Sequence, residues 1–290
     1  MHPTEPTLPD ALDPNALAAI AAQVSGALGA DGRPVAGPHE SLDPIVGDWS
    51  IFQLKGGHRF STDDLLTAWL SGQVSPGALR LLDIGAGIGS VGLMALWLRP
   101  AAARLRMVEA QQVSHLLAKK TIAYNGLGDR IDAQHGDLRA IDAIDDDAAR
   151  YTAVTGSPPY IPLGKGVASP HPQRAACRME LRGDVFDYAA AAARVLAPEG
   201  SLSLCHAAED PRPEAAIAAA GLQLWRRIDV YFRRGRKPTI ALFCAGWGEA
   251  PAGLGLREPI VIREEGGDFT PQYLSIRAGM GGPPVHPSTQ

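Results

Sequence analysis

The chain has 290 residues, of which 46% are hydrophobic and 20% are charged, which permits a packed core and argues against global disorder. Its formal net charge of −4 means that a nucleic-acid partner would have to be bound by a local basic patch. Three widely spaced cysteines without a CxxC pair argue against a disulfide framework or a structural zinc site.

Targeting and metal signals are also missing from the sequence. No apolar run approaches the ~18 residues of a membrane-spanning helix, and the N-terminal stretch lacks the basic and apolar regions of a signal peptide. The histidines show no spacing typical of metal ligands. We therefore expect a soluble cytoplasmic protein with no membrane segment and no bound metal.

The first part of the chain predicts little regular structure. Residues 1–11 are rich in proline, and we expect them to be disordered. Asp13 and Pro14 favour the start of a helix that continues to about residue 30. Residues 31–44 resemble a linker because they are rich in glycine and proline. A hairpin turning at Gly56-Gly57 should follow, and then a helix capped by Ser61 or Thr62.

From Arg80 onward, strands alternate with helices. The apolar patterns predict seven strands, within residues 79–85, 103–110, 129–137, 151–156, 201–207, 222–232 and 238–247. Such alternation predicts a mostly parallel sheet with helices on both faces. The last two strands lie too close in sequence for a crossover helix, so the last strand should be antiparallel. Residues 257–276 would add a small strand and a turn, and Lys119-Lys120 should lie on a solvated helix face.

A glycine-rich loop follows the first of these strands. Glycines between a strand and a helix let the backbone approach a ligand closely. The acidic residue before them suits a ligand with a cationic amino-acid moiety better than a pyrophosphate. A tight turn without a ligand is the alternative. The residues concerned are Asp83, Gly85, Gly87 and Gly89.

Two more acidic residues follow the next two strands. Glu109 lies about 20 residues beyond the glycines, where an acidic side chain commonly binds ribose hydroxyls. Asp137 follows the third strand and is a candidate acceptor for an exocyclic adenine amino group. Each of these carboxylates could instead be solvated at a strand end or in a turn.

The tetrapeptide Ser157-Pro158-Pro159-Tyr160 follows the fourth strand. Consecutive prolines restrict φ and remove two backbone donors, so the segment should be a rigid turn. Such a turn holds a hydroxyl, free carbonyls and an aromatic ring in place, and it can bind a planar amino group. The loop, the two acids and this turn should all lie at the carboxyl edge of the sheet, where open α/β sheets bind ligands.

This constellation resembles the class I S-adenosylmethionine-dependent methyltransferases. More narrowly, the tetrapeptide is similar to the (Asn/Asp/Ser)-Pro-Pro-(Tyr/Phe/Trp) motif of amino-methyltransferases, which methylate planar nitrogens. Residues 57–70, 170–200, 236–248 and 256–276 resemble segments of the bacterial tRNA1(Val) adenine-N6 methyltransferases. The resemblance covers the chain from about Trp49 to Ile276.

The resemblance implies a fold, a division of the chain and an activity. The fold would be Rossmann-like, with a seven-stranded, mostly parallel sheet whose last strand is antiparallel. Residues 46–278 would form the methyltransferase domain, after an N-terminal helix and linker in residues 1–45 and before a disordered tail in residues 279–290. The enzyme would transfer a methyl group from S-adenosylmethionine to the N6 amino group of adenine in tRNA or another structured RNA.

The resemblance also assigns roles to residues. Asp83 and the glycines would hold the methionine part of the cofactor, Glu109 the ribose and Asp137 the adenine. In the family, the motif's Asn side chain and the first proline's carbonyl accept hydrogen bonds from the target amino group. The aromatic residue stacks on an unstacked base. The matching residues here are Ser157, Pro158 and Tyr160.

The sequence departs from the family at Ser157, where the family has Asn. A hydroxyl still accepts a hydrogen bond, but it is shorter and can also donate. Serine at this position is familiar from DNA cytosine-N4 methyltransferases. Three alternatives therefore stay open: methylation of a protein glutamine side chain, methylation of cytosine N4 in DNA, and a non-catalytic, cofactor-binding protein that binds RNA.

Two basic groups are candidates for binding phosphates. Arg233, Arg234, Arg236 and Lys237 crowd the connection between the last two strands, where they could give salt-dependent affinity for RNA. Arg174, Arg178 and Arg182 recur every fourth residue after the tetrapeptide, which would place them on one helical face at the substrate entrance. Solvated surface charge is the alternative for both groups.

Overall fold

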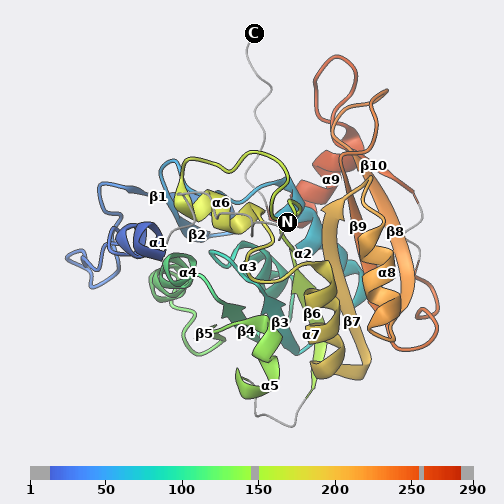
Figure 1. The fold of residues 1–290 in the computed structure, drawn as a ribbon, viewed down its shortest axis with the longest axis horizontal. Coiled ribbons are helices and arrows are strands. Elements are labelled where there is room, and N and C mark those ends of the chain that lie inside the picture. The colour runs from blue at the N-terminus through green and yellow to red at the C-terminus, as the bar shows by residue number, and fades with distance from the viewer. Residues whose placement is uncertain (1–13, 145–149, 255–257, 282–290) are drawn as a thin grey trace, which may run out of the picture.

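The computed structural model describes residues 14–144, 150–254 and 258–281 (Figure 1). Its main feature is an eight-stranded sheet in the order β10-β8-β9-β7-β6-β3-β4-β5. The strands are β3 (Arg80–Ile84), β4 (Arg104–Glu109), β5 (Ile131–His135), β6 (Tyr151–Gly156), β7 (Leu196–Ala207), β8 (Gln223–Tyr231), β9 (Ile240–Gly246) and β10 (Ile260–Val261). All neighbouring pairs are parallel except those that β9 makes with β7 and β8.

The predicted fold class is therefore confirmed, with one strand more than expected. The additional strand, β10, has two residues and pairs with β8 at the edge of the sheet. Strand β9 is antiparallel because the connection from β8 spans only residues 232–239, too few for a crossover helix.

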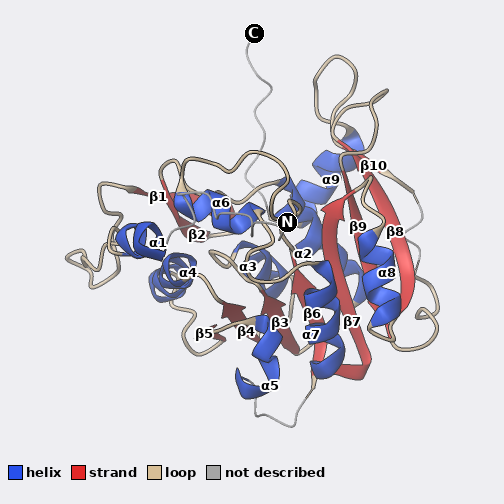
Figure 2. Cartoon of the chain, in the orientation of Figure 1, coloured by secondary structure: helices blue, strands red, loops and turns tan. Residues whose placement is uncertain are grey.

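Helices cover both faces of the sheet (Figure 2). They are α1 (Pro14–Ala21), α2 (Thr62–Val74), α3 (Ser90–Trp97), α4 (Gln112–Tyr124), α5 (Ile141–Ile144), α6 (Pro172–Arg178), α7 (Val185–Val195), α8 (Arg212–Ala219) and α9 (Pro271–Gly279). Successive side chains of a strand point to opposite faces. Accordingly, Leu81 of β3 joins the core formed with α2, α3 and α4, whereas Leu82 joins the core formed with α7 and α8. Nowhere in the described ranges is a helix both long and apolar enough to cross a membrane.

The helix that precedes the glycine-rich loop begins where its sequence predicts. Ser61 is the N-cap of α2, and Asp64 completes a capping box by accepting from the Ser61 backbone amide. Helix α3, on the same face of the sheet, is rich in apolar residues and is buried from Ser90 to Leu96.

The region before α2 differs from the prediction. Strands β1 (Glu40–Val46) and β2 (Trp49–Leu54) form an antiparallel hairpin that turns at Gly47, not at Gly56-Gly57. The linker prediction is therefore wrong for residues 40–44. Pro44 argued against a strand in the sequence. The two-stranded sheet tolerates it, next to an irregularity in the register between Pro44 and Val46. Helix α1 is also shorter than expected and ends at Ala21. The remaining prediction for residues 1–11 lies outside the described residues.

A buried ion pair joins this hairpin to α4, which corrects the expectation that Lys120 is solvated. Lys120 Nζ lies 2.5 Å from Glu40 Oε2, and the two side chains are 6% and 0% exposed. The glutamate also accepts hydrogen bonds from the Ser25 and Gly37 amides. Lys120 Nζ lies 4.5 Å from the ring centroid of Phe52 in β2. Helical periodicity could not reveal this arrangement, because the partner is 80 residues away.

The C-terminal segment contains a helix that the sequence interpretation missed. After β10, Thr270 caps α9 by accepting from the Tyr273 amide, and Pro271 occupies the first helical position. This Thr-Pro pair was the available signal. The predicted disordered tail begins at residue 279, of which the structure describes only residues 279–281.

Candidate active site

A cavity of about 650 Å³ opens at the carboxyl edge of the sheet. Most of the predicted site residues line it: Asp83, Gly85, Gly87, Glu109, Ser157, Pro158, Tyr160, Arg174 and Arg178. Residues from the start of α2 and from the loop before it complete the lining. In Figure 1, α6 lies over this edge of the sheet, and Arg174, Ala176 and Cys177 of this helix line the cavity.

The glycine-rich loop meets the cavity with backbone that only glycine adopts easily. Gly85 has φ of +61°, and a Cβ there would lie 1.8 Å from the hydroxyl of Tyr188 in α7. Gly87 has φ of +57°, but a Cβ there would meet no atom within 4 Å. Glycine is therefore required at residue 85 by packing, and at residue 87 the missing side chain leaves space that a ligand can use. Gly89 caps α3 and does not line the cavity.

Asp83 is buried beneath this loop and held by two donors. Thr155 Oγ1 donates to its Oδ1 at 2.7 Å, and the Gly92 amide donates to its Oδ2 at 2.9 Å. Burial raises the pKa of this carboxyl to about 7 although both hydrogen bonds favour the charged form. The group is thus a carboxyl without enough nearby positive charge to offset its desolvation.

Glu109 is bound to the loop itself. The Gly87 amide donates to its Oε2 at 2.8 Å, and the Gln111 amide donates to its Oε1 at 2.5 Å. Burial raises its pKa, while these two backbone hydrogen bonds lower it. Backbone amides thus hold both carboxylate oxygens of this cavity-lining side chain.

Asp63 and Asp64 also line the cavity, and neither was among the predicted site residues. Asp64 is buried and accepts from Ser90 Oγ at 3.0 Å. Burial raises its pKa to about 8, and the neighbouring Asp63 adds to the rise. Their segment, residues 57–70, resembled the family, but the capping pattern alone indicated only the start of a helix.

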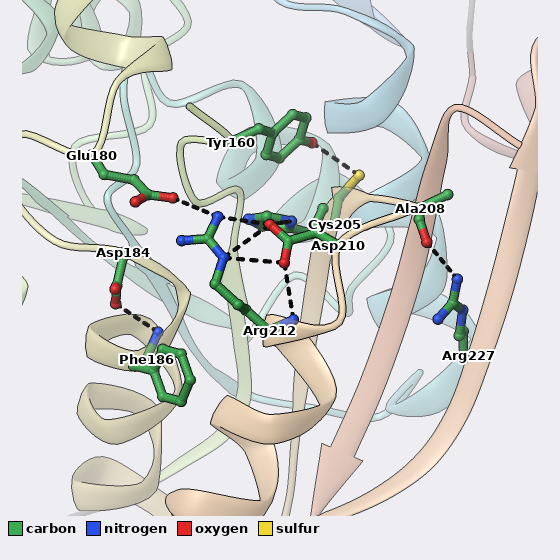
Figure 3. Close-up of polar contacts among 10 residues, drawn as sticks. Tyr160, Glu180, Asp184, Phe186, Cys205, Ala208, Asp210, Arg212 and Arg227 are labelled. Carbon is green, nitrogen blue, oxygen red and sulfur yellow. Dashed lines mark hydrogen bonds and ion pairs between the residues drawn. The ribbon is translucent and has the colours of Figure 1, made fainter. Parts of the chain in front are cut away.

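The tetrapeptide turn forms the opposite part of the wall. Tyr160 Oη donates to Asp63 Oδ2 at 3.2 Å, and its ring lies 4.9 Å from the ring of His206. Cys205 Sγ lies 3.2 Å from the same hydroxyl (Figure 3). Burial raises the pKa of the Tyr160 hydroxyl well above its usual value, so the phenol stays neutral. The ring is thus held by contacts to α2 and to β7.

An ion-pair network lies behind this turn. Arg212 Nη2 lies 2.8 Å from Glu180 Oε1 and 2.6 Å from Asp210 Oδ2 (Figure 3). The buried His206 has its Nδ1 3.6 Å from Asp210 Oδ2. Burial lowers the pKa of His206, which keeps the ring neutral near pH 7. The network connects the segment after the tetrapeptide to the end of β7, and spacing in the sequence did not predict it.

Asp137, like Gly89, is a predicted cofactor residue that does not line the cavity. Its carboxylate binds Arg139, with Oδ2 2.6 Å from Nη2, while the adjacent Gly136 and Leu138 line the cavity. It also accepts from the Arg139 amide as the cap of a short 3-10 helix. These hydrogen bonds lower its pKa.

The two basic groups lie at different distances from the cavity. Arg174, Arg178 and Arg182 all line it, but α6 ends at Arg178, so the prediction of a single helical face that includes Arg182 is wrong. Met179, directly after the helix, has an extended backbone. Arg182 therefore reaches the cavity from the segment after the helix. Arg174 itself donates to the Gly57 carbonyl.

The basic loop between β8 and β9 stands at the rim. Its flanking residues Phe232, Thr239 and Ile240 line the cavity, whereas the predicted binding residues Arg233, Arg234, Arg236 and Lys237 are exposed and do not. Arg234 pairs with Glu264, and Lys237 pairs with Glu209.

Comparison with known proteins identifies sequence relatives of the chain. No protein-family profile matches the chain. It is 28% identical over 201 residues to the tRNA1(Val) (adenine(37)-N6)-methyltransferase of Tolumonas auensis, spanning 69% of this chain and 81% of the relative. The enzyme of the same name from Pasteurella multocida is 23% identical, over 73% of this chain and 84% of the relative.

A solved structure with the same fold is that of a predicted O-methyltransferase from Agrobacterium tumefaciens. Its TM-score is 0.54 at 21% identity, covering 76% of this chain and 98% of that protein. The fold and the sequence relatives therefore place the chain among the class I S-adenosylmethionine-dependent methyltransferases, with S-adenosylmethionine as its methyl donor and the bacterial tRNA1(Val) adenine-N6 enzymes as its relatives.

Proposed function

We propose that this methyltransferase modifies the N6 amino group of an adenine in tRNA. The observation that carries the proposal is that the glycine-rich loop and the Ser157-Pro158-Pro159-Tyr160 turn line one cavity. A methyl donor and a planar amino group could therefore meet there. The relatives, which are named for the same transfer to a tRNA adenine, support this choice of acceptor.

The cavity suits S-adenosylmethionine in size and charge. Its volume of about 650 Å³ lies within the range of pockets that bury cofactor-sized ligands. Asp64 and Asp83 have raised pKa values because burial opposes their charge, and a ligand with an ammonium and a sulfonium group would supply the missing positive charge. When bound, the cofactor supplies an activated methyl group.

We assign the cofactor-binding residues as the resemblance predicts. Asp83 and the loop of Gly85, Gly87 and Gly89 would hold the methionine part, and Glu109 would accept from the ribose hydroxyls. Asp137 would bind the adenine only after its carboxylate leaves Arg139, since the two are paired. This assignment makes Asp137 the weakest contributor to affinity in the set.

The tetrapeptide turn would hold the target base. Ser157 Oγ and the Pro158 carbonyl would accept hydrogen bonds from the amino group, and the Tyr160 ring would stack on a base that has left its helix. Acceptors on both N–H groups draw the nitrogen lone pair out of conjugation and toward the methyl carbon. Positioning of this kind supplies much of the rate in group transfer from an activated donor.

The arginines would bind the RNA backbone. Arg174 and Arg178 line the cavity, and the loop of Arg233, Arg234, Arg236 and Lys237 stands at its rim, so both groups could contact phosphates on either side of an inserted base. A chain of net charge −4 that gathers cations here favours a polyanion over a protein acceptor.

Transfer of labelled methyl groups tests the proposal. The protein is incubated with labelled S-adenosylmethionine and, separately, with total tRNA, DNA and protein extract, and the product is digested and identified. We expect N6-methyladenosine in tRNA and no label with a Tyr160→Ala variant. Label on cytosine would instead support the DNA-type acceptor that Ser157 suggests, and label on glutamine would support a protein acceptor. Cofactor binding without transfer to any pool would support a non-catalytic role.

A further inference from the structure

The acceptor side of the cavity contains a carboxylate that the proposed function does not yet use. Asp63 is the second residue of α2, and it lines the same cavity as the tetrapeptide turn. Its Oδ2 accepts from Tyr160 Oη at 3.2 Å, and its Oδ1 accepts from Ser61 Oγ. Two donors from different segments thus hold its orientation.

The tetrapeptide by itself supplies the amino group with a weaker acceptor than an Asn motif would. A planar amino group has two N–H donors, and the Pro158 carbonyl can accept only one of them in a favourable geometry. Ser157 offers a short hydroxyl, which also carries a hydrogen of its own, where an amide oxygen would only accept. The site therefore has a reason to use another acceptor close to the turn.

We propose that Asp63 is this acceptor, and that it takes up the proton that the amino nitrogen loses. A carboxylate has two oxygens with about four lone-pair positions, so the hydrogen bonds from Ser61 and Tyr160 leave others available. The N-terminal turn of α2 favours a negative charge at this place. The proposal rests on the proposed function in one respect only, namely that the acceptor is a planar amine.

Asp64, next to Asp63 in the chain, has different hydrogen-bond partners. Asp64 accepts from Ser90 Oγ and from the Ser61 amide, so it lies on the side of the glycine-rich loop. Asp63 lies on the side of Tyr160. Adjacent carboxyls at the start of α2 thus serve different parts of the cavity, which gives the experiment a matched control.

The amino nitrogen forms a bond to the methyl carbon with its lone pair, the carbon–sulfur bond breaks, and sulfur keeps the electron pair as a neutral thioether. The nitrogen is left with a positive charge and an additional proton relative to the product. That proton passes to the Asp63 carboxylate, and from the resulting carboxylic acid to solvent at the open side of the cavity.

A double-mutant cycle between residues 63 and 157 tests the role. Asp63→Asn and Ser157→Asn are made singly and together, and single-turnover rates are measured on the methyl acceptor identified for the wild-type protein, with S-adenosylmethionine affinity measured by calorimetry. We expect Asp63→Asn to slow transfer about 100-fold, as general-base catalysis typically contributes, while the cofactor Kd changes less than about threefold. Ser157→Asn should recover about tenfold of this loss, because it restores an amide acceptor.

Two control variants separate this role from others. Tyr160→Phe removes the hydroxyl that contacts Asp63 but keeps the ring, and we expect a loss of only a few-fold. If Tyr160→Phe were as slow as Asp63→Asn, Asp63 would act only by holding the tyrosine, and the proposal would be overturned. Asp64→Asn should weaken cofactor binding instead. A large rise in cofactor Kd for Asp63→Asn, with an unchanged rate at saturation, would also overturn it.

The acceptor found in the labelling experiment separates this proposal from the proposed function. If the wild-type protein methylates cytosine or a glutamine amide, the assignment to tRNA adenine fails, yet Asp63 can be tested on that amine with the same cycle. If it methylates tRNA adenine and Asp63→Asn transfers at the wild-type rate, the role of Asp63 fails alone. A protein that methylates no pool would overturn both.

Discussion

The two sides of the cavity hold charge in different ways. On the glycine-loop side, Asp64 and Asp83 are buried, bound to backbone or hydroxyl donors, and raised in pKa. On the opposite side, the residues from Arg233 to Lys237 are exposed at the rim. The buried wall therefore suits a small cationic ligand, and the fold positions its acidic side chains. The rim loop presents exposed cations, which suit a large anion.

The same contrast extends to the ion pairs that support each side. We expect Lys120→Met to destabilise the protein by about 3–5 kcal/mol, because it leaves the buried Glu40 without its partner. Lys237→Met, which breaks the exposed pair with Glu209, should cost less than about 1 kcal/mol. Urea denaturation of both variants measures the difference. Similar stabilities would show that the buried pair does not support the fold.

This pair also bears on the domain boundary. A methyltransferase domain starting at residue 46 would lack Glu40 and would leave Lys120 buried and unpaired. We therefore propose that the folded unit begins at Glu40 or earlier. A double variant, Glu40→Leu with Lys120→Met, should recover part of the stability, since an apolar pair of similar volume avoids the desolvation cost of both charges.

The glycine-rich loop offers a second test of the buried side. Gly85→Ala should destabilise by about 2–4 kcal/mol, because alanine is strained at this φ and its methyl would collide with the Tyr188 hydroxyl. Gly87→Ala carries the strain without the collision, so it should cost about 1–2 kcal/mol.

The affinity for S-adenosylmethionine should separate these two variants in a different way from their stability. The added methyl at residue 87 projects into open space of the cavity, so the Gly87→Ala protein should fold but bind S-adenosylmethionine more than tenfold more weakly. Thermal unfolding and calorimetry together measure both effects. A Gly87→Ala protein with normal affinity would argue against the loop as the cofactor cradle.

The sequence predicted the site residues at the ends of neighbouring strands but missed those that other elements bring to the site. Asp83 lies near the end of β3, Gly87 follows that strand and Glu109 ends β4. The topology alone brings the ends of neighbouring parallel strands to one edge. Asp63 and Asp64 lie at the start of α2, which precedes the main sheet in the chain. His206 lies in β7, and Asp210 follows that strand. Their approach depends on tertiary packing, for which spacing in the chain gives no signal. Strand β1 was missed for the same reason. The pairing of β1 with β2 overrides the low strand preference of Pro44.

Proton release on cofactor binding tests the charge of the buried wall. Asp83 and Asp64 have folded-state pKa values of about 7 and about 8, above the ordinary value of 3.8, so each contributes stability at low pH that is lost as the pH rises through its folded pKa. A bound cation favours their ionised forms. Affinity for S-adenosylmethionine should therefore rise with pH between 6 and 8, by at most about tenfold per unit for each proton released.

Calorimetry in buffers of different ionisation enthalpy counts those protons. Asp83→Asn should remove part of the release and weaken binding. If binding releases no protons at pH 7, the carboxyls are already ionised in the free protein, and the charge argument for the cofactor fails.

The exposed wall should respond to salt and to charge reversal, with the smallest effects of the set. Arg233 and Arg236 are the better targets in the rim loop, because Arg234 and Lys237 already pair with glutamates. Arg233→Glu with Arg236→Glu should weaken tRNA binding several-fold and lower the slope of log affinity against log salt by about 1–2, since each phosphate contact contributes about 0.7–0.9.

Arg33→Glu is a control for each single charge reversal in that variant. This exposed arginine lies over the ring of Tyr124 in α4, and α4 and strands β8 and β9 lie at opposite ends of the molecule (Figure 1). This control should change tRNA affinity little, and neither variant should alter the cofactor Kd or the unfolding temperature. Filter binding at several salt concentrations measures the affinities. Equal losses per reversed charge in the rim variant and the control would mean that the protein's total charge, and not the rim loop, attracts RNA. Loss of cofactor binding in the rim variant would mean that the two walls are not independent.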